Sequence, residues 1–123
     1  MQVHKLAWLG TRTGRDAQTA AFFRDVLGLR SDPVAPGFWV LNLPDGSKVE
    51  VFGPESRINP HFTTGPVAGF LVEDVHDARS YLEAEGIEFI GPVHEWKPTG
   101  EAWSHFRAPD GNVYEITHAP KNR

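Results

Sequence analysis

Two glutamates stand at the same place in a repeated motif. The segments Pro44–Glu50 and Pro109–Glu115 both read PDGxxxE. In such a turn the proline presets φ, the aspartate caps the turn with its side chain, and the glycine accepts a positive φ. We therefore expect each copy to be a hairpin turn that feeds a strand carrying a glutamate, Glu50 in the first copy and Glu115 in the second.

Strand alternation predicts that both glutamates point into one cavity. Glu50 shares a face with Phe52, and Glu115 shares a face with Thr117, because successive side chains of a strand point to opposite sides. His4, on an early strand-like run, would add an imidazole. Two inward carboxylates near an imidazole either hold a cation or must be protonated or paired, because isolated buried charge is costly.

A second group of reactive side chains lies in the segment 103–107. Alternation places Trp103, His105 and Arg107 on one face. His105 is a candidate for substrate contact or proton transfer, or it pairs with a neighbouring acid of the sheet. Arg107 could bind a substrate carboxylate or phosphate, or it bridges to Asp110 on the surface. The aromatic residues that could line the cavity are Trp8, Phe38, Phe52, Trp96 and Trp103.

The elements that must position these residues are duplicated as well. Apolar spacing predicts helices over 16–27 and 74–85, each beginning at a capping aspartate and ending before a glycine. Strand-like runs occupy 3–9, 29–34, 38–43 and 48–52, then 67–72, 87–93, 102–107 and 112–117. The order is β-α-β-β-β twice. Such a sheet buries one face under its helix and leaves the other to curve around a cavity, where we expect the function.

Length and composition limit the alternatives. A chain of 123 residues fits one domain, 1–123, with a first module of about 1–60 and a second of about 61–123. No cysteine is present, which predicts a cytoplasmic setting without disulfides or zinc-thiolate sites. The net charge of -4 with scattered basic residues argues against nucleic acid as a partner. No apolar run is long enough to span a membrane.

Two motifs resemble those of a known family. The helix ending FFRDVLGL at 22–29 and the strand APDGNVYEI at 108–116 resemble motifs of the vicinal oxygen chelate superfamily. This superfamily includes glyoxalases, bleomycin-resistance proteins and extradiol dioxygenases, and the resemblance covers essentially the whole chain. It implies an α+β, glyoxalase-like fold of two βαβββ modules that form a curved, cup-shaped mixed sheet. It does not fix the activity, because the fold carries both enzymes and drug-sequestering proteins.

The resemblance also implies positions for a metal. Metal-dependent members take ligands from the first and last strands of each module, positions that look here like His4, Glu50, Val67 and Glu115. Val67 has no donor atom, so the chain departs from the glyoxalase and the two-histidine-one-carboxylate patterns. His61 could replace the missing ligand. A divalent metal ion of unknown identity, bound by His4, Glu50 and Glu115, is one interpretation, and a site without metal is the other.

Two functions follow from these interpretations. The first is a metal-dependent lyase or isomerase of glyoxalase type, with Glu50, Glu115 and His105 as catalytic residues. The second is a metal-free protein that binds a small aromatic or antibiotic-like molecule without transforming it. In either case we expect the ligand to contact Trp8, Phe52, Trp103 and Arg107. Family members usually pair modules within or between chains, so a homodimer is also expected.

Overall fold

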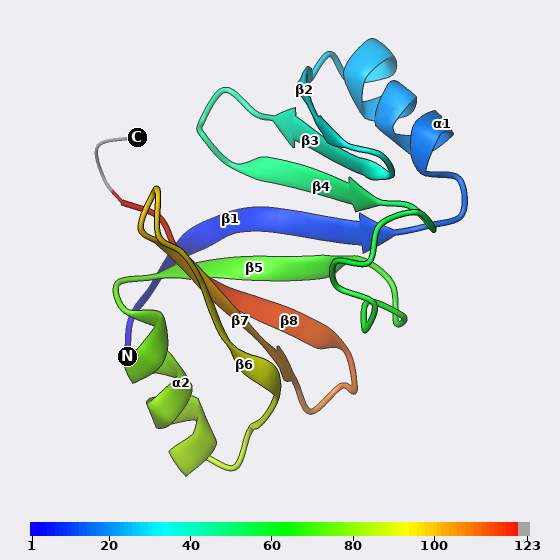
Figure 1. The fold of residues 1–123 in the computed structure, drawn as a ribbon. Coiled ribbons are helices and arrows are strands. Elements are labelled where there is room, and N and C mark those ends of the chain that lie inside the picture. Colours follow the sequence, from blue (N-terminus) through cyan, green and yellow to red (C-terminus); the bar gives the residue numbers. More distant parts are fainter. Residues whose placement is uncertain (121–123) are drawn as a thin grey trace. The chain divides into compact units, whose positions relative to one another are not determined.

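The computed structural model describes residues 1–120, and Figure 1 shows their course. In chain order the elements are β1 (Val3–Arg12), α1 (Asp16–Ala21), the π-helix η1 (Phe22–Val26), β2 (Arg30–Ala35), β3 (Phe38–Asn42), β4 (Lys48–Phe52), β5 (Val67–Val72), α2 (Val75–Ala84), β6 (Glu88–Trp96), β7 (Glu101–Arg107) and β8 (Val113–His118). The predicted α+β fold of two βαβββ modules is confirmed. No helix in the described range is long and apolar enough to cross a membrane.

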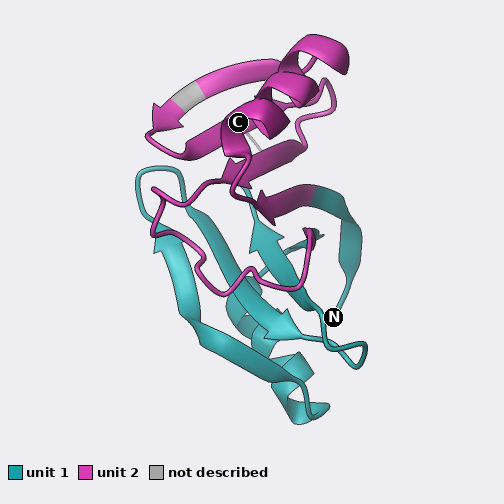
Figure 2. Ribbon diagram, turned by 90° about the vertical axis from the view of Figure 1, so that its right-hand side faces the viewer, with its two compact units in different colours: residues 1–7, 68–123 teal, residues 8–67 magenta. Residues whose placement is uncertain are grey.

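The chain divides into two compact units, shown in teal and magenta in Figure 2. Unit 1 comprises Met1–Ala7 and the chain from Ala68 on, and unit 2 comprises Trp8–Val67. Strand β1 therefore contributes its first half to unit 1 and its second half to unit 2. The division into modules near residue 60 stays a prediction.

Unit 2 is built on strands in the order β2-β3-β4-β1. β1 runs parallel to β4, whereas β3 is antiparallel to both β2 and β4, so the pairing is mixed as expected. α1 packs against β3 and β4. Leu41 and Val51 are fully buried, and Ala20 of α1 is buried as well. Because Glu50 alternates with Val51, the glutamate points to the face away from α1.

The start of α1 differs from the prediction that Asp16 caps it. The N-cap residue is Arg15, and no side chain caps the helix. The Asp16 carboxylate instead accepts a hydrogen bond at 3.1 Å from the indole Nε1 of Trp39 on β3. A Cβ atom at Gly53 would collide with this carboxylate, so the glycine leaves room for it. Asp16 therefore fastens the helix to the sheet, and this competing bond explains the missing cap.

Unit 1 is built on strands in the order β1-β5-β8-β7-β6. β5 runs parallel to β8, and β7 is antiparallel to β8 and β6. α2 covers one face of this sheet through a core cluster of Val72, Val75, Ala78 and Ile116. The helix begins as predicted at Asp74, whose side chain accepts from the backbone N–H of Asp77 at 3.0 Å. The opposite face of the sheet carries His105 and Glu115.

Both PDG turns form as predicted. Gly46 and Gly111 have φ values of 89° and 83°, a region that costs other residues strain. Asp45 and Asp110 each accept a hydrogen bond from the backbone N–H two residues later, at 2.9 and 3.0 Å. The two turns thus set Glu50 and Glu115 at matching places on β4 and β8.

Candidate functional site

The face of unit 1 that α2 leaves uncovered carries most of the predicted site. Glu115 on β8 lies opposite His105 on β7 and opposite Gly69 on β5. Cross-strand partners point to the same side of a sheet, so His105 and Glu115 share this face. Trp103 and Thr117, also opposite one another, lie on it two residues along each strand. The register therefore brings together two of the predicted catalytic residues and one predicted ligand contact.

His105 and Glu115 form a buried hydrogen bond. The imidazole Nε2 lies 2.9 Å from Oε1 of Glu115, and the two side chains are 0% and 6% exposed. The histidine is thus paired with a neighbouring acid of the sheet, as one of the two sequence interpretations has it. The bond also fixes the carboxyl group, because neither side chain can turn without breaking it.

Burial sets the charge of this pair. Desolvation lowers the pKa of His105 to about 4. It raises the pKa of Glu115 well above its usual range. The distance would suit an ion pair, but burial disfavours both charged forms. At neutral pH the imidazole of His105 is therefore uncharged, and burial also favours the uncharged form of the Glu115 carboxyl group.

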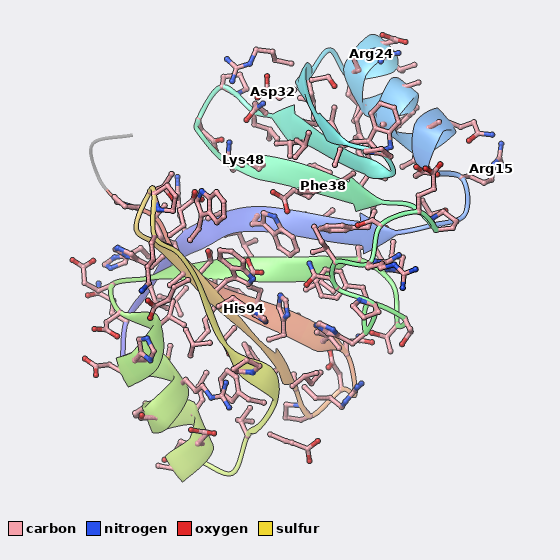
Figure 3. The ribbon with its side chains drawn as sticks, in the orientation of Figure 1. Arg15, Arg24, Asp32, Phe38, Lys48 and His94 are labelled. Atoms are coloured by element: carbon pink, nitrogen blue, oxygen red, sulfur yellow. The ribbon has the colours of Figure 1, made fainter. Side chains whose placement is uncertain are left out.

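Trp103 and Arg107 flank the pair on β7. The Trp103 ring is stacked on that of His94, with centroids 5.8 Å apart and planes at 21°. His94, labelled in Figure 3, is exposed at this edge of the face. Arg107 is exposed too, and its Nη1 donates to the carbonyl of Gly111 at 2.8 Å. The arginine thus fastens the closing turn, and the bridge to Asp110 that the sequence suggested is not among its contacts.

In unit 2 the predicted site residues gather beside Glu50. The register places Glu50 on β4 opposite Gly10 on β1. A Cβ atom at Gly10 would collide with the indole of Trp8, so this ring lies over the glycine. The same indole contacts Phe62, with centroids 5.9 Å apart. Gly10 therefore makes room for an aromatic side chain next to Glu50.

Phe52 is the most deeply buried of the predicted ligand contacts. It is 1% exposed. Its ring is stacked on Phe38, with centroids 5.0 Å apart, and meets Phe62 edge to face. Phe38, labelled in Figure 3, lies on the neighbouring strand β3. Phe52 is thus part of the packed aromatic group of unit 2.

His4, the predicted metal ligand on β1, contacts a different acid, Glu73. It stands near the start of β1, where its Nε2 is 3.4 Å from Oε2 of Glu73. Both side chains are well exposed, at 38% and 71%. Across residues 1–120, no group of three or more His, Asp or Glu side chains has an arrangement that could hold a metal ion.

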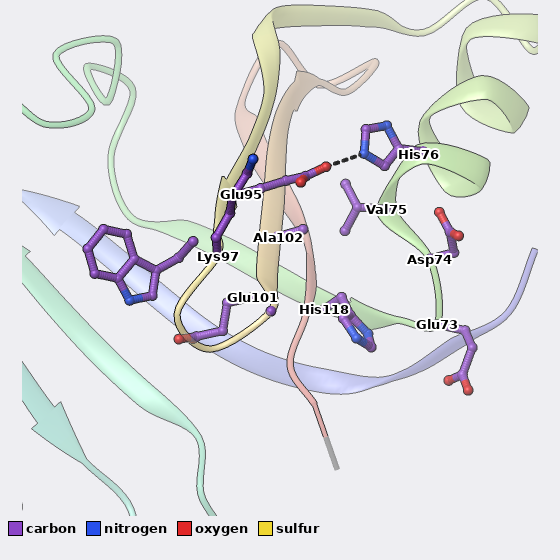
Figure 4. Close-up of a pocket in the computed structure, with 11 residues that line it drawn as sticks. Glu73, Asp74, Val75, His76, Glu95, Lys97, Glu101, Ala102 and His118 are labelled. Carbon is purple, nitrogen blue, oxygen red and sulfur yellow. Dashed lines mark hydrogen bonds and ion pairs between the residues drawn. The ribbon is translucent and has the colours of Figure 1, made fainter. Parts of the chain in front are cut away.

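A separate cavity of about 260 Å³ opens beside the start of α2 (Figure 4). Its lining includes His76, Glu95 and His118, and His76 is bonded to Glu95 at 2.7 Å. Trp96, one of the aromatic residues that the sequence suggested for a cavity wall, is part of this lining, whereas the predicted catalytic, metal-binding and ligand-contact residues are not. Sequence reasoning assigned these histidines no role, because a loop or helix-surface histidine carries no signal until the fold brings an acid to it.

Comparison with known families gives one match. The model of the glyoxalase/bleomycin resistance protein/dioxygenase superfamily matches residues 5–116. The chain belongs to this superfamily. No curated protein matches its sequence.

Solved structures of the superfamily fold resemble the chain closely in shape but not in sequence. A hypothetical protein from Bacillus halodurans shares 16% identity, with a TM-score of 0.73 over 97% of this chain and 96% of that one. A superfamily member from Vibrio splendidus shares 19%, with a TM-score of 0.66 over 94% and 98%. Methylmalonyl-CoA epimerase from Mycobacterium tuberculosis shares 15%, with a TM-score of 0.70 over 97% and 90%. These likenesses show the fold.

The strand register shows which residue of β1, the first strand of the first module, corresponds to which residue of β5, the first strand of the second module. Gly10 is the partner of Glu50 in the parallel pair β1·β4, and Gly69 is the partner of Glu115 in β5·β8. The two glutamates hold the same place in the repeated motif. Gly10 and Gly69 are therefore equivalent positions.

This equivalence corrects the assignment of His4. Val67 lies two residues before Gly69, and the residue two before Gly10 is Trp8. Trp8, and not His4, is therefore the counterpart of Val67. The error arose because β1 has 10 residues and β5 has 6, so counting from the strand start stops too early, at His4 in place of Trp8.

The corrected set of residues does not fit a metal ion. Val67 has no donor atom, and the indole of Trp8 has an N–H but no free lone pair. Each module then offers a single carboxylate, Glu50 or Glu115, where the family resemblance implies two ligands. Of these, Glu115 is already hydrogen-bonded to His105 through Oε1. We therefore derive no chemistry through a metal.

Proposed function

We propose that this superfamily member binds a small organic molecule, aromatic or antibiotic-like, without a divalent metal ion. The observation that supports this most directly is the strand register, which makes Trp8 the counterpart of Val67, so that neither module has a metal ligand at the first-strand position that the family resemblance implies. Dehydrating a divalent ion requires several charged or strongly polar ligands. Glu50 and Glu115 are too few for this, the more so because burial disfavours the charged form of Glu115.

The surroundings of His105 and Glu115 suit such a ligand. Trp103, Leu71 and Thr117 are half-buried on the same face of unit 1, where they supply flat and apolar surface beside one buried hydrogen-bonding group. Small-molecule sites are mostly apolar, with a few polar groups that fix orientation. Trp103, which the sequence predicts to contact the ligand, is part of this proposed site.

A metal-dependent lyase or isomerase is the second candidate. Glu50 and Glu115, retained at equivalent strand positions, favour it. Among the similar structures, methylmalonyl-CoA epimerase from Streptomyces coelicolor was solved with 2-nitronate-propionyl-CoA, so an enzyme with this fold takes an acyl-CoA analogue. In this chain, however, His4 is not at the ligand position, which removes one of the three predicted ligands.

Metal analysis separates the two candidates. Protein purified without chelator is titrated with Mn²⁺, Ni²⁺ and Zn²⁺ by calorimetry, alongside Glu50→Gln and Glu115→Gln. We expect no stoichiometric ion and no saturable binding that either substitution removes. Stoichiometric binding that both variants lose would establish the metal-dependent candidate instead.

We also propose that two copies of the chain form a homodimer. Several large apolar side chains are exposed, among them Leu6 at 62% on β1 and Val26 at 70% on η1. Such surface is removed from water when two copies associate.

A further inference from the structure

The Glu115 carboxyl group has one oxygen that is not used within the protein. Its Oε1 is bonded to His105. Across residues 1–120, every fully buried side-chain nitrogen or oxygen has a hydrogen-bond partner. The second oxygen, Oε2, has no partner in this range, so it must be the part of this 6% exposed side chain that still meets solvent. A carboxyl group more than nine-tenths buried thus presents one atom outward.

The groups around this carboxyl do not supply a charge to balance an ionised form. On the same face of unit 1, the remaining ionisable residues of β6 and β7 are Glu88, His94, Glu101 and Arg107, of which Glu101 is half-buried and the other three are exposed. Arg107 is bonded to the carbonyl of Gly111. An ionised Glu115 would therefore be buried without a cation, which is costly.

We propose that Oε2 of Glu115, held in place by His105, hydrogen-bonds to an uncharged polar group of a small aromatic ligand that packs beside Trp103. This inference rests on the proposed function and names the ligand class. Trp103 is the diagonal cross-strand neighbour of Glu115, within reach of a single ring carrying one polar substituent. Burial disfavours the charged carboxylate that a cationic ligand would pair with, and an anionic ligand would have to bury a second carboxylate beside Glu115.

Three probes of the same size and different charge test the ligand class with the unmodified protein. Benzamide is uncharged, benzylamine is cationic and benzoate is anionic at neutral pH. Each is titrated into labelled protein, and NMR follows the signals of Trp103, His94 and Thr117. We expect benzamide to shift these signals saturably and to bind at least about tenfold more tightly than either ion. Equal or tighter binding of an ion would overturn the proposal.

Variants then test the contact atom. Glu115→Gln keeps an uncharged group that can bond both His105 and the ligand, so benzamide binding should stay within about threefold of wild type. Glu115→Leu removes both oxygens and should weaken binding about tenfold or more. The matched control is Glu88→Leu, which makes the same change at an exposed position of the same face and should alter nothing. Benzamide binding that survives Glu115→Leu would overturn the assignment of Oε2.

Substitutions at His105 test its role as a positioning residue. His105→Leu should weaken benzamide binding, and His105→Gln, which can still bond Oε1, should restore part of it. If neither substitution changes the affinity, His105 does not position Glu115. The NMR spectrum will show whether a leucine variant fails to fold. In that case the three probes and the Glu115→Gln variant still test whether Oε2 of Glu115 contacts an uncharged group of the ligand.

Failure of this inference is distinguishable from failure of the proposed function. If none of the probes shifts the signals of Trp103, His94 or Thr117, the contact at Glu115 is overturned. The proposed function fails on a different result, the stoichiometric metal binding described above.

Discussion

Burial of one hydrogen-bonded pair, His105 and Glu115, should shape the pH dependence of stability. Folding lowers the pKa of His105 from 6.5 to about 4, so its contribution is present above pH 6.5 and is lost as the pH falls toward 4. Folding raises the pKa of Glu115 well above 4.5, so its contribution is present below pH 4.5 and is lost as the pH rises through the folded pKa. Between 4.5 and 6.5 the two effects oppose each other.

We therefore expect the pair to favour a plateau of stability above pH 4.5, followed by a decline as the pH rises further toward the folded pKa of Glu115. Urea unfolding at a series of pH values should show a slope approaching about 1.4 kcal/mol per pH unit above the plateau. Glu115→Gln should abolish this decline, because only His105 then titrates, whereas the exposed control Glu88→Gln should keep it. A wild-type free energy of unfolding that keeps rising above pH 6.5 would contradict the assignment.

The same pair should show strong coupling between its members. His105→Leu leaves the Glu115 carboxyl group inside the protein without a partner, which should lower the free energy of unfolding by about 1 to 3 kcal/mol. Adding Glu115→Leu removes the orphaned group and should recover part of that loss. Denaturant unfolding of both single variants and the double variant measures this. A double variant less stable than either single one would show that the two effects merely add.

At the scale of elements, β1 is adapted to hold an aromatic ring over its own backbone. A methyl group at Gly10 would occupy space taken by the Trp8 indole, so Gly10→Ala should displace the ring and cost about 1 to 3 kcal/mol. Trp8→Leu should relieve the clash and reduce that cost. Unfolding and the indole N–H signal of Trp8 in NMR measure both effects.

Gly14 provides the control for this substitution. A Cβ atom there meets nothing within 4 Å, and its φ is not in the left-handed region. Gly14→Ala should therefore leave both the stability and the Trp8 signal nearly unchanged. If Gly10→Ala behaves like Gly14→Ala, the indole does not lie over Gly10.

At the scale of the whole molecule, the proposed homodimer predicts sedimentation at twice the chain mass of 13.7 kDa. Leu6→Lys and Val26→Lys each replace an exposed apolar side chain with a charge, and we expect the substitution that lies within the interface to shift the protein toward monomer. Ile58→Lys, at an exposed apolar residue of a loop, is the control. Sedimentation of wild type as a monomer at micromolar concentration would contradict the dimer.

The sequence by itself determined the two βαβββ modules and the faces of their strands. Helix spacing, strand alternation and the PDG turns are local properties, readable from a few neighbouring residues. Alternation also placed His105 correctly on one face with Trp103. The two turns positioned Glu50 and Glu115 at matching points, because each turn sets the start of its own strand.

Only the tertiary structure decided which residues meet across strands. The register of β1 against β4, which makes Trp8 and not His4 the counterpart of Val67, depends on pairing between segments about forty residues apart. The bond from His105 to Glu115 depends in the same way on the pairing of β7 with β8. The charge of that pair depends on burial, which alternation along β7 and β8 does not predict. Local sequence patterns predict neither the strand register nor the burial of the pair, because both are set by contacts between distant segments.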